Sequence, residues 1–267
     1  MQTVVISKDE KAFHQSLLAH DIRLDGRAPL VSRQFKVEIN PLPLSPSSCR
    51  VTWGYGYGDT TEVMVSVSTE IMKEEQSLPQ ISVKALSGSF GIDFDPTEIC
   101  QVVNSTLEQF LKNSGALDPS QFVIVNSPYS WKIFIDVLIY KAAGAVYEAA
   151  MIGIRESLSR LTFPQLIVTP GETISELHFD IDENKEELKL IDPEKLPYVL
   201  SFAVAPNSLF LDPTPIEISV VQSLLVIGVS KAGSILGLNH FGERGLKTNA
   251  IEEITNNLQM LLSQQMN

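Results

Sequence analysis

The stretch SWKIFIDVLIYKAAGAVYEAAMIGIRESLSRL, residues 130–161, decides how this chain folds. Its first part, from Ile133 to Tyr140, is an apolar run of β-branched and aromatic residues interrupted only by Asp136. Such a run predicts a strand that is buried on both faces. Gly144 predicts a tight turn, and small or apolar residues at three- and four-residue spacing up to Leu161 then predict a helix with one buried face. We therefore expect a strand–turn–helix unit packed back on itself.

Composition limits the functions that are open to the chain. It has 267 residues, of which 44% are hydrophobic, and a net charge of −12. Nine acidic residues and two lysines fall between Glu172 and Glu194, and we expect this acidic run to form a solvated loop. Because phosphate binding depends on lysine and arginine displacing counterions, a general nucleic-acid-binding surface is excluded, and any RNA contact must be local or supplied with help from partners.

Cysteine and histidine usage gives no sign of a metal site. Cys49 and Cys100 form no CxxC pair, which favours a reduced intracellular protein and argues against structural zinc. The four histidines are scattered, so we expect surface or packed side chains instead of ligands. No apolar run reaches 18 residues and the first residues lack a signal-peptide core, so we expect no membrane span, no secretory signal, no metal and no cofactor.

The remaining patterns predict an α+β protein. Helices are expected at 9–20, at 96–114 with Asp95 as its cap, and at 247–262. Strands are expected at 34–40, 50–53, 60–71, 81–86, 122–125, 198–204, 208–211, 218–230 and 234–240. The glycines of residues 54–59 fit neither a P-loop nor a dinucleotide fingerprint, so a hairpin turn is expected there. Strands followed by a helix appear twice, which predicts two similar βα halves, about 8–161 and 162–264, in one compact domain over 1–267.

Several segments together resemble a known family. In order, they are DIRLDGR at 21–27, GDTTEVMVSVSTEI at 58–71, WKIFIDVLIYKAAGAVYEAAMIGIRESL at 131–158 and FLDPTPIEIS at 210–219. This order resembles the RNase PH family over residues 8 to 264 and, more narrowly, the non-catalytic ring subunits of the eukaryotic RNA exosome. The resemblance implies the RNase PH fold, which is also described as ribosomal protein S5 domain 2-like.

The resemblance also implies where a phosphate site would lie. Active members of the family hold phosphate at a Gly-Gly-Thr-Arg turn that opens the helix after the long strand, where an arginine and the helix N-terminus bind the anion. The matching positions here are Gly144, Ala145, Val146 and Tyr147. The arginine and the hydroxyl are both missing, and Glu148 adds a negative charge that would disfavour phosphate. The turn is therefore expected to be degenerate and to bind no phosphate.

A second expectation concerns an acidic pair. Active members carry two aspartates six positions apart after a strand in the second half, and the matching positions here are Asp212 and Ile218. Glu217 is expected on the other face if the segment is extended, so it is not expected to replace the second aspartate. Asp212 alone, before Pro213, is then expected to be a turn residue. No catalytic residue is therefore expected.

The family also places a loop at the neck of an RNA channel. Its counterpart would be residues 71–79, where Lys73 is the only cation. We expect a solvated turn more than an RNA contact, with Lys73 as the one candidate for such a contact. Arg23 and Arg27 near the start are expected to be structural or to lie at an interface.

The resemblance implies a structural role in a larger assembly. It implies a catalytically inactive subunit of the exosome core ring that supports 3′-to-5′ RNA processing and degradation, including ribosomal RNA maturation and mRNA turnover. The implied partners are other RNase PH-type subunits in a hetero-hexameric ring, S1/KH cap subunits, catalytic exoribonuclease subunits and RNA in the central channel, with no membrane. The implied locations are nucleus, nucleolus and cytoplasm.

Two alternatives remain. The first is a divergent phosphate-dependent 3′-5′ exoribonuclease of the same family, which would need a replacement cation at the turn and a second carboxylate near Asp212. The second is an unrelated α+β binding protein, because a shared fold does not fix a function.

Overall fold

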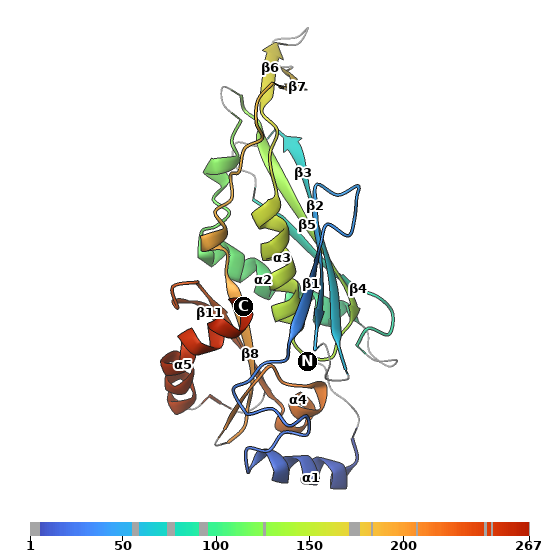
Figure 1. The fold of residues 1–267 in the computed structure, drawn as a ribbon, viewed down its shortest axis with the longest axis vertical. Helices are drawn as coiled ribbons and strands as arrows, with labels where there is room; N and C mark the ends of the chain where they lie inside the picture. The colour runs from blue at the N-terminus through green and yellow to red at the C-terminus, as the bar shows by residue number, and fades with distance from the viewer. Residues whose placement is uncertain are drawn as a thin grey trace.

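A computed structural model describes residues 6–54, 59–73, 78–90, 96–124, 127–170, 177–182, 184–206, 208–242, 245–246 and 248–266. Two main sheets face each other with helices between them (Figure 1). The first sheet has the order β1 (Phe35–Ile39), β2 (Ser47–Trp53), β3 (Thr61–Met72), β5 (Ser130–Lys141) and β4 (Gln80–Ala85). Its neighbours are antiparallel, except that β4 runs parallel to β5.

The second sheet is fully antiparallel. Its order is β11 (Ile235–Gly242), β10 (Ser223–Val229), β8 (Tyr198–Val204) and β9 (Leu209–Leu211). A separate two-stranded hairpin is made by β6 (Leu166–Pro170) and β7 (Leu177–Ile181). The strands expected at 34–40, 60–71, 81–86, 133–140, 198–204, 208–211 and 234–240 are therefore present, each within three residues of its expected ends.

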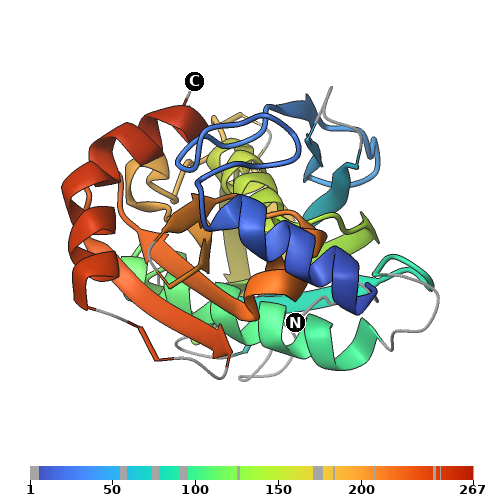
Figure 2. The same ribbon diagram turned by 90° about the horizontal axis from the view of Figure 1, so that it is seen from below.

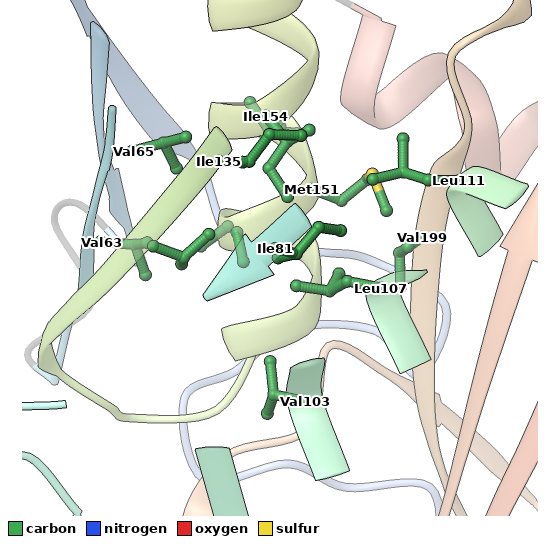
Figure 3. Packing of buried hydrophobic residues seen from close by; sticks show 14 of the residues in the cluster. Val63, Val65, Ile81, Val103, Leu107, Leu111, Ile135, Met151, Ile154 and Val199 are labelled. Carbon is green, nitrogen blue, oxygen red and sulfur yellow. The ribbon is translucent and has the colours of Figure 1, made fainter. Parts of the chain in front are cut away.

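The helices α2 (Pro96–Ser114) and α3 (Val146–Arg160) fill the space between the sheets. They bury one continuous apolar core, part of which is shown in Figure 3. Gly153 of α3 lies against Val65 of β3, where an added Cβ would come within 2.5 Å of a valine methyl carbon. The central strand–turn–helix unit predicted from residues 130–161 is thus the link between the first sheet and the core.

Three more helices cover the outside. The helix α5 (Thr248–Met266) packs on the outer side of the second sheet, and α1 (Lys8–Leu18) lies across α4 (Pro215–Val221), as Figure 2 shows. Short 3₁₀ turns span Pro119–Phe122 and Pro193–Lys195. On α1, His14 and Leu18 are buried, whereas Phe13 is 57% exposed.

The single strand expected at 218–230 was wrong. Residues Pro215–Val221 form α4, and the strand begins only at Ser223. Thr214 and Glu217 make a reciprocal capping box, and Pro215 occupies the first helical turn, where proline is favoured. Gln222 ends the helix in the left-handed region at φ 55°. These local signals outweigh the β-branched residues that favoured a strand.

Two shorter expectations also need correction. Of the expected strand at 122–125, Phe122 ends a 3₁₀ turn and Val123 makes a single bridge with Ser130, while residue 125 lies outside the described residues. The acidic run is not only a loop, because residues Leu177–Ile181 within it form β7. Residues 55–58 of the expected glycine turn, Asp95, Lys247, and parts of the acidic run and of the 71–79 loop lie outside the described residues.

Cys49 and Cys100 are both free and buried. Burial raises the pKa of the Cys49 thiol to about 12, so this thiol stays protonated.

Across the residues that the structure describes, no helix has the length and hydropathy needed to cross a membrane. Within that same part of the chain, no group of three histidine, cysteine or acidic side chains converges as metal ligands would. The two-half domain organisation stays a prediction.

Candidate functional site

The turn expected to correspond to a phosphate site lies against the segment that follows Asp212. Gly144 has φ 81°, and a Cβ at this position would lie 2.2 Å from the carbonyl oxygen of Pro213. The hydroxyl of Thr61 accepts from the backbone N–H of Ala143 at 2.8 Å and donates to the carbonyl of Gly144. The turn is therefore held between β3 and the second half of the chain, and only glycine fits its closest point.

The carboxylate of Asp212 is surrounded by donors. Arg33 donates to it from its backbone N–H at 2.8 Å, from Nε at 2.9 Å and from Nη2 at 2.6 Å. Arg27 Nη1 and Trp53 Nε1 each donate to Oδ2 at 3.1 Å. All four side chains are at most 6% exposed. Four of these five hydrogen bonds end on Oδ2 and one on Oδ1, so both oxygens of the carboxylate are held by protein donors.

A second buried ion pair lies beside the first. Arg23 binds Glu217 through two parallel hydrogen bonds, Nε to Oε1 at 2.8 Å and Nη2 to Oε2 at 2.7 Å. Arg23 also donates to the backbone carbonyls of Leu211 and Asp212 at 2.8 and 3.0 Å. The expectation that Glu217 faces away was wrong, because the helical turn of α4 brings its carboxylate to Arg23 while it caps the helix at Thr214.

Together these residues form what we call the arginine cluster: Arg23, Arg27, Arg33, Asp25, Asp212 and Glu217. Its three positive and three negative charges cancel. Burial lowers the pKa of Arg27, and the charge of Asp212 offsets this only in part. For Arg33, burial is outweighed by the hydrogen bonds and charge of Asp212, which raise its pKa. The expectation that Arg23 and Arg27 are structural agrees with this geometry.

The turn itself faces apolar surroundings. A pocket of about 100 Å³ in front of it is lined by apolar side chains that include Phe90, Val146, Tyr147, Ile218, Leu224 and Phe241. None of the described residues that line it carries a positive charge. The ring of Tyr147 stacks on Phe241 with centroids 6.2 Å apart and an interplanar angle of 15°. Burial, followed by the charge of Glu148, raises the pKa of Tyr147, so its hydroxyl stays neutral.

Glu148 does not face the pocket as a free carboxylate. It is 1% exposed, and its Oε1 accepts from the backbone N–H of Ser201 at 2.8 Å and from the Ser201 hydroxyl. Its Oε2 has no hydrogen-bond partner among the described residues. Burial, followed by the charge of Asp212, raises the pKa of Glu148 to about 7. The side chain thus ties α3 to β8 and does not stand ready to meet a ligand.

Two further features surround the site. A cavity of about 490 Å³ lies between α1, α4 and the end of β5, with apolar side chains and charges of both signs in its lining. Lys73 follows β3 directly and is exposed, but residues 74–77 after it lie outside the described residues. The structure therefore brings the turn, Asp212 and Ile218 together, and leaves Lys73 apart. Sequence reasoning missed Arg33, which belongs to no motif.

Comparison with known proteins finds similarity to components of the exosome complex. No protein-family model matches the chain. Exosome complex component RRP42 of Saccharomyces cerevisiae is 28% identical over 84% of this chain and 82% of the relative. Exosome complex component Rrp42 of Methanothermobacter thermautotrophicus is 22% identical over 85% of this chain and 82% of the relative. The chain is a homologue of exosome components named Rrp42. Exosome complex component RRP45 of Danio rerio is also similar, with 26% identity over 91% of this chain and 61% of the relative.

Solved structures show the same fold. An Archaeoglobus fulgidus exosome with RNA bound to the active site has a chain with TM-score 0.75 and 20% identity, covering 96% of this chain and 97% of that one. An archaeal exosome core gives TM-score 0.70 and 18% identity over 92% and 90% of the two chains. The RNase PH-type fold expected from the sequence is therefore confirmed, as is the resemblance to exosome components of the ribosomal RNA-processing protein 42 type.

Proposed function

We propose that this chain is a non-catalytic, structural subunit of the exosome core ring, where it supports 3′-to-5′ RNA processing and degradation, including ribosomal RNA maturation and mRNA turnover. The observation that carries the proposal is the engagement of the Asp212 carboxylate by five protein donors, including those of two buried guanidinium groups. Its negative charge is neutralised by the buried guanidinium groups of Arg27 and Arg33, so coordinating a metal ion or taking part in proton transfer would require breaking these ion pairs.

The degenerate turn supports the same proposal. Phosphoryl-transfer chemistry depends on positive charge placed where the phosphate charge develops. At the turn the pocket offers the apolar surfaces of Val146, Tyr147 and Phe241 instead, and its volume of about 100 Å³ is small. The nearest guanidinium, that of Arg33, is already bound to Asp212. Binding phosphate there would require desolvating an anion without a counter-charge, which is unfavourable.

We further propose the partners that such a subunit needs: other RNase PH-type subunits in a hetero-hexameric ring, S1/KH cap subunits, catalytic exoribonuclease subunits, and RNA in the central channel. The relatives are named as exosome components, and this supports the assignment. Phe13, Ile22 and Leu24 are more than half exposed near the large cavity, and apolar side chains grouped in this way suit a protein interface. The proposed locations are nucleus, nucleolus and cytoplasm.

The catalytic part of the proposal is tested with the isolated chain, single-stranded RNA, inorganic phosphate and Mg²⁺. We expect no release of nucleoside diphosphates above background. Release by the wild-type chain that Asp212→Ala abolishes and that Asp136→Asn leaves unchanged would overturn it, because Asp136 is an exposed aspartate on β5 with no place in the cluster. That result would favour the divergent exoribonuclease.

The assembly part is tested separately, by mass spectrometry of the intact complex purified through a tag on this chain. We expect related ring subunits in stoichiometric amounts. A monodisperse monomer that recruits none of them would contradict the assembly, whatever the outcome of the RNA assay.

A further inference from the structure

The hairpin of β6 and β7 stands away from the body of the molecule, at the end opposite α1 (Figure 1). Within the described ranges, each of its strands pairs only with the other. Its base is fixed by reciprocal backbone hydrogen bonds between Phe163 and Leu188 at 2.9 and 2.7 Å, and the ring of Tyr129 contacts Phe179 at 5.0 Å. Two-stranded hairpins are marginal in water without further packing, so this one is held at its base and exposed beyond it.

The strand β7 has two chemically different faces. Leu177, Phe179 and Ile181 alternate with polar residues, so they share one face, and the register places Val168 opposite Phe179 on that face. Ile181 is 61% exposed. This apolar face is therefore only partly covered by the rest of the chain.

The other face of β7 carries negative charge. His178 and Asp180 lie on it and are exposed, and Asp182 continues the alternation beyond the strand. Asp182 is paired with Lys185 at 3.1 Å, so Asp180 is the carboxylate that the strand itself presents. The stretch from Glu172 to Glu194, in which β7 lies, has nine acidic residues against two lysines. The strand thus offers an amphipathic, acidic edge.

We propose that the outer edge of β7 is a docking edge for an extended peptide segment of a partner protein, in which apolar residues alternate with lysine or arginine. Such a segment would add a third strand, with main-chain hydrogen bonds for affinity and alternating side chains for specificity. Its cations would lie beside Asp180, and its apolar residues beside Phe179 and Ile181. It would complete a three-stranded sheet, which is the minimum for independent stability.

Charge distinguishes this partner from a second copy of the chain. Pairing β7 with β7 of another molecule in the register that sets Asp180 opposite Asp180 would place like charges in cross-strand positions, where they are destabilising. Charged residues on an exposed edge are a common protection against self-association. The same charges attract a basic strand. The proposal concerns a surface away from the arginine cluster and stands whether or not the chain is catalytic.

The test uses the full chain and a fluorescein-labelled probe peptide of alternating lysine and valine, roughly eight residues long, close to the length of a natural strand. Binding is followed by fluorescence anisotropy at low salt. We expect saturable binding that Asp180→Lys weakens at least tenfold. Asp136→Lys, which makes the same change of net charge at an exposed position on β5, should leave the affinity within twofold.

Two control peptides separate strand addition from simple charge attraction. Methylation of alternate backbone nitrogens along one edge of the probe should weaken binding at least tenfold, because it removes main-chain donors without changing charge. An alternating glutamate–valine peptide should not bind. Hydrogen exchange at residues 177–181 should slow when the lysine–valine probe binds.

Each of three results would overturn the proposal. The first is no binding of the lysine–valine probe. The second is equal binding of the methylated probe or of the Asp180→Lys variant. The third is a dimer of the free chain, seen by sedimentation, that disappears when Ile181 is replaced by lysine, because the edge would then be covered by a second copy.

Discussion

Asp212→Asn removes one negative charge from the arginine cluster with almost no change in side-chain size. In the folded protein Arg27 and Arg33, whose side chains are each 2% exposed, then lack one counter-charge. Oδ2 alone accepts four hydrogen bonds, and a neutral amide oxygen accepts from cations more weakly than a carboxylate does. Breaking a buried ion pair by removing one partner typically costs about 3–5 kcal/mol. We therefore expect the free energy of unfolding to fall by an amount in that range. A single hydrogen bond to a charged group is worth about 1.5–3 kcal/mol, but the energies of the bonds to Oδ2 cannot be summed, because they are not additive.

The assay is equilibrium unfolding in urea at neutral pH, followed by tryptophan fluorescence. Trp53 donates to Asp212 directly, and Trp131 lies on β5, so both report on the first sheet. A fall in the midpoint at constant slope measures the lost free energy of unfolding. Asp136→Asn is the matched control, since this aspartate is exposed, and its effect should stay within about 0.5 kcal/mol.

A loss below about 1 kcal/mol for Asp212→Asn would refute the reasoning, because it would place Asp212 in a solvated environment where ion pairs are worth that little. The double change Arg33→Met with Asp212→Leu adds a second check. Removing both charges should cost less than the sum of the two single changes, since no buried charge is left unpaired. Strict additivity would mean that the pair does not interact.

Two other predictions concern the turn and the helix after it. Gly144→Ala should destabilise the protein by roughly 3 kcal/mol or more in urea unfolding, because the new Cβ would lie 2.2 Å from the Pro213 carbonyl oxygen. The control Gly88→Ala has the same φ of 81° but open space around it, so it should cost only about 1–2 kcal/mol. Equal losses for the two variants would contradict this prediction. Because the pKa of Glu148 is raised to about 7, its carboxyl group stays protonated in the folded state between pH 4.5 and 7, where the unfolded chain has lost that proton. The contribution of Glu148 to the free energy of unfolding is therefore fully present below pH 4.5 and is lost as the pH rises through 7. Relative to Glu148→Gln, which keeps an acceptor for Ser201, the wild type should therefore lose roughly 3 kcal/mol between pH 4.5 and 8 in pH-dependent unfolding, and parallel pH profiles would contradict the assignment.

Local patterns predicted most of the elements well, because long periodic segments carry their own signal. The strand from Ile133 to Tyr140 and the helix after Gly144 needed only apolar spacing and one glycine. The strand expected at 218–230 failed because β-branched content outweighed the capping signals of Thr214, Pro215 and Glu217 in the interpretation, although these signals were visible in the sequence.

The candidate site was predictable in position and only partly in chemistry. The resemblance singled out Asp212 and the turn at Gly144 as separate segments, and the structure shows that Gly144 lies against the carbonyl of Pro213, the residue after Asp212. What Asp212 binds could not be predicted, because Arg33 lies 179 residues away and belongs to no motif. Helix and strand periodicities describe only neighbours along the chain, so a contact of this kind becomes visible only in three dimensions.

The wide separation of the charge partners also governs how this protein is made. Arg23 leaves the ribosome 194 residues before Glu217, which corresponds to roughly 10 to 40 s of translation at about 5–20 residues per second. During that interval the guanidinium groups of Arg23, Arg27 and Arg33 must stay hydrated or be bound by a chaperone. A chain truncated before residue 211 lacks Asp212 and Glu217, so it cannot form the ion pairs of Arg23 and Arg33 with the second half, and we expect it to be degraded by quality-control proteases.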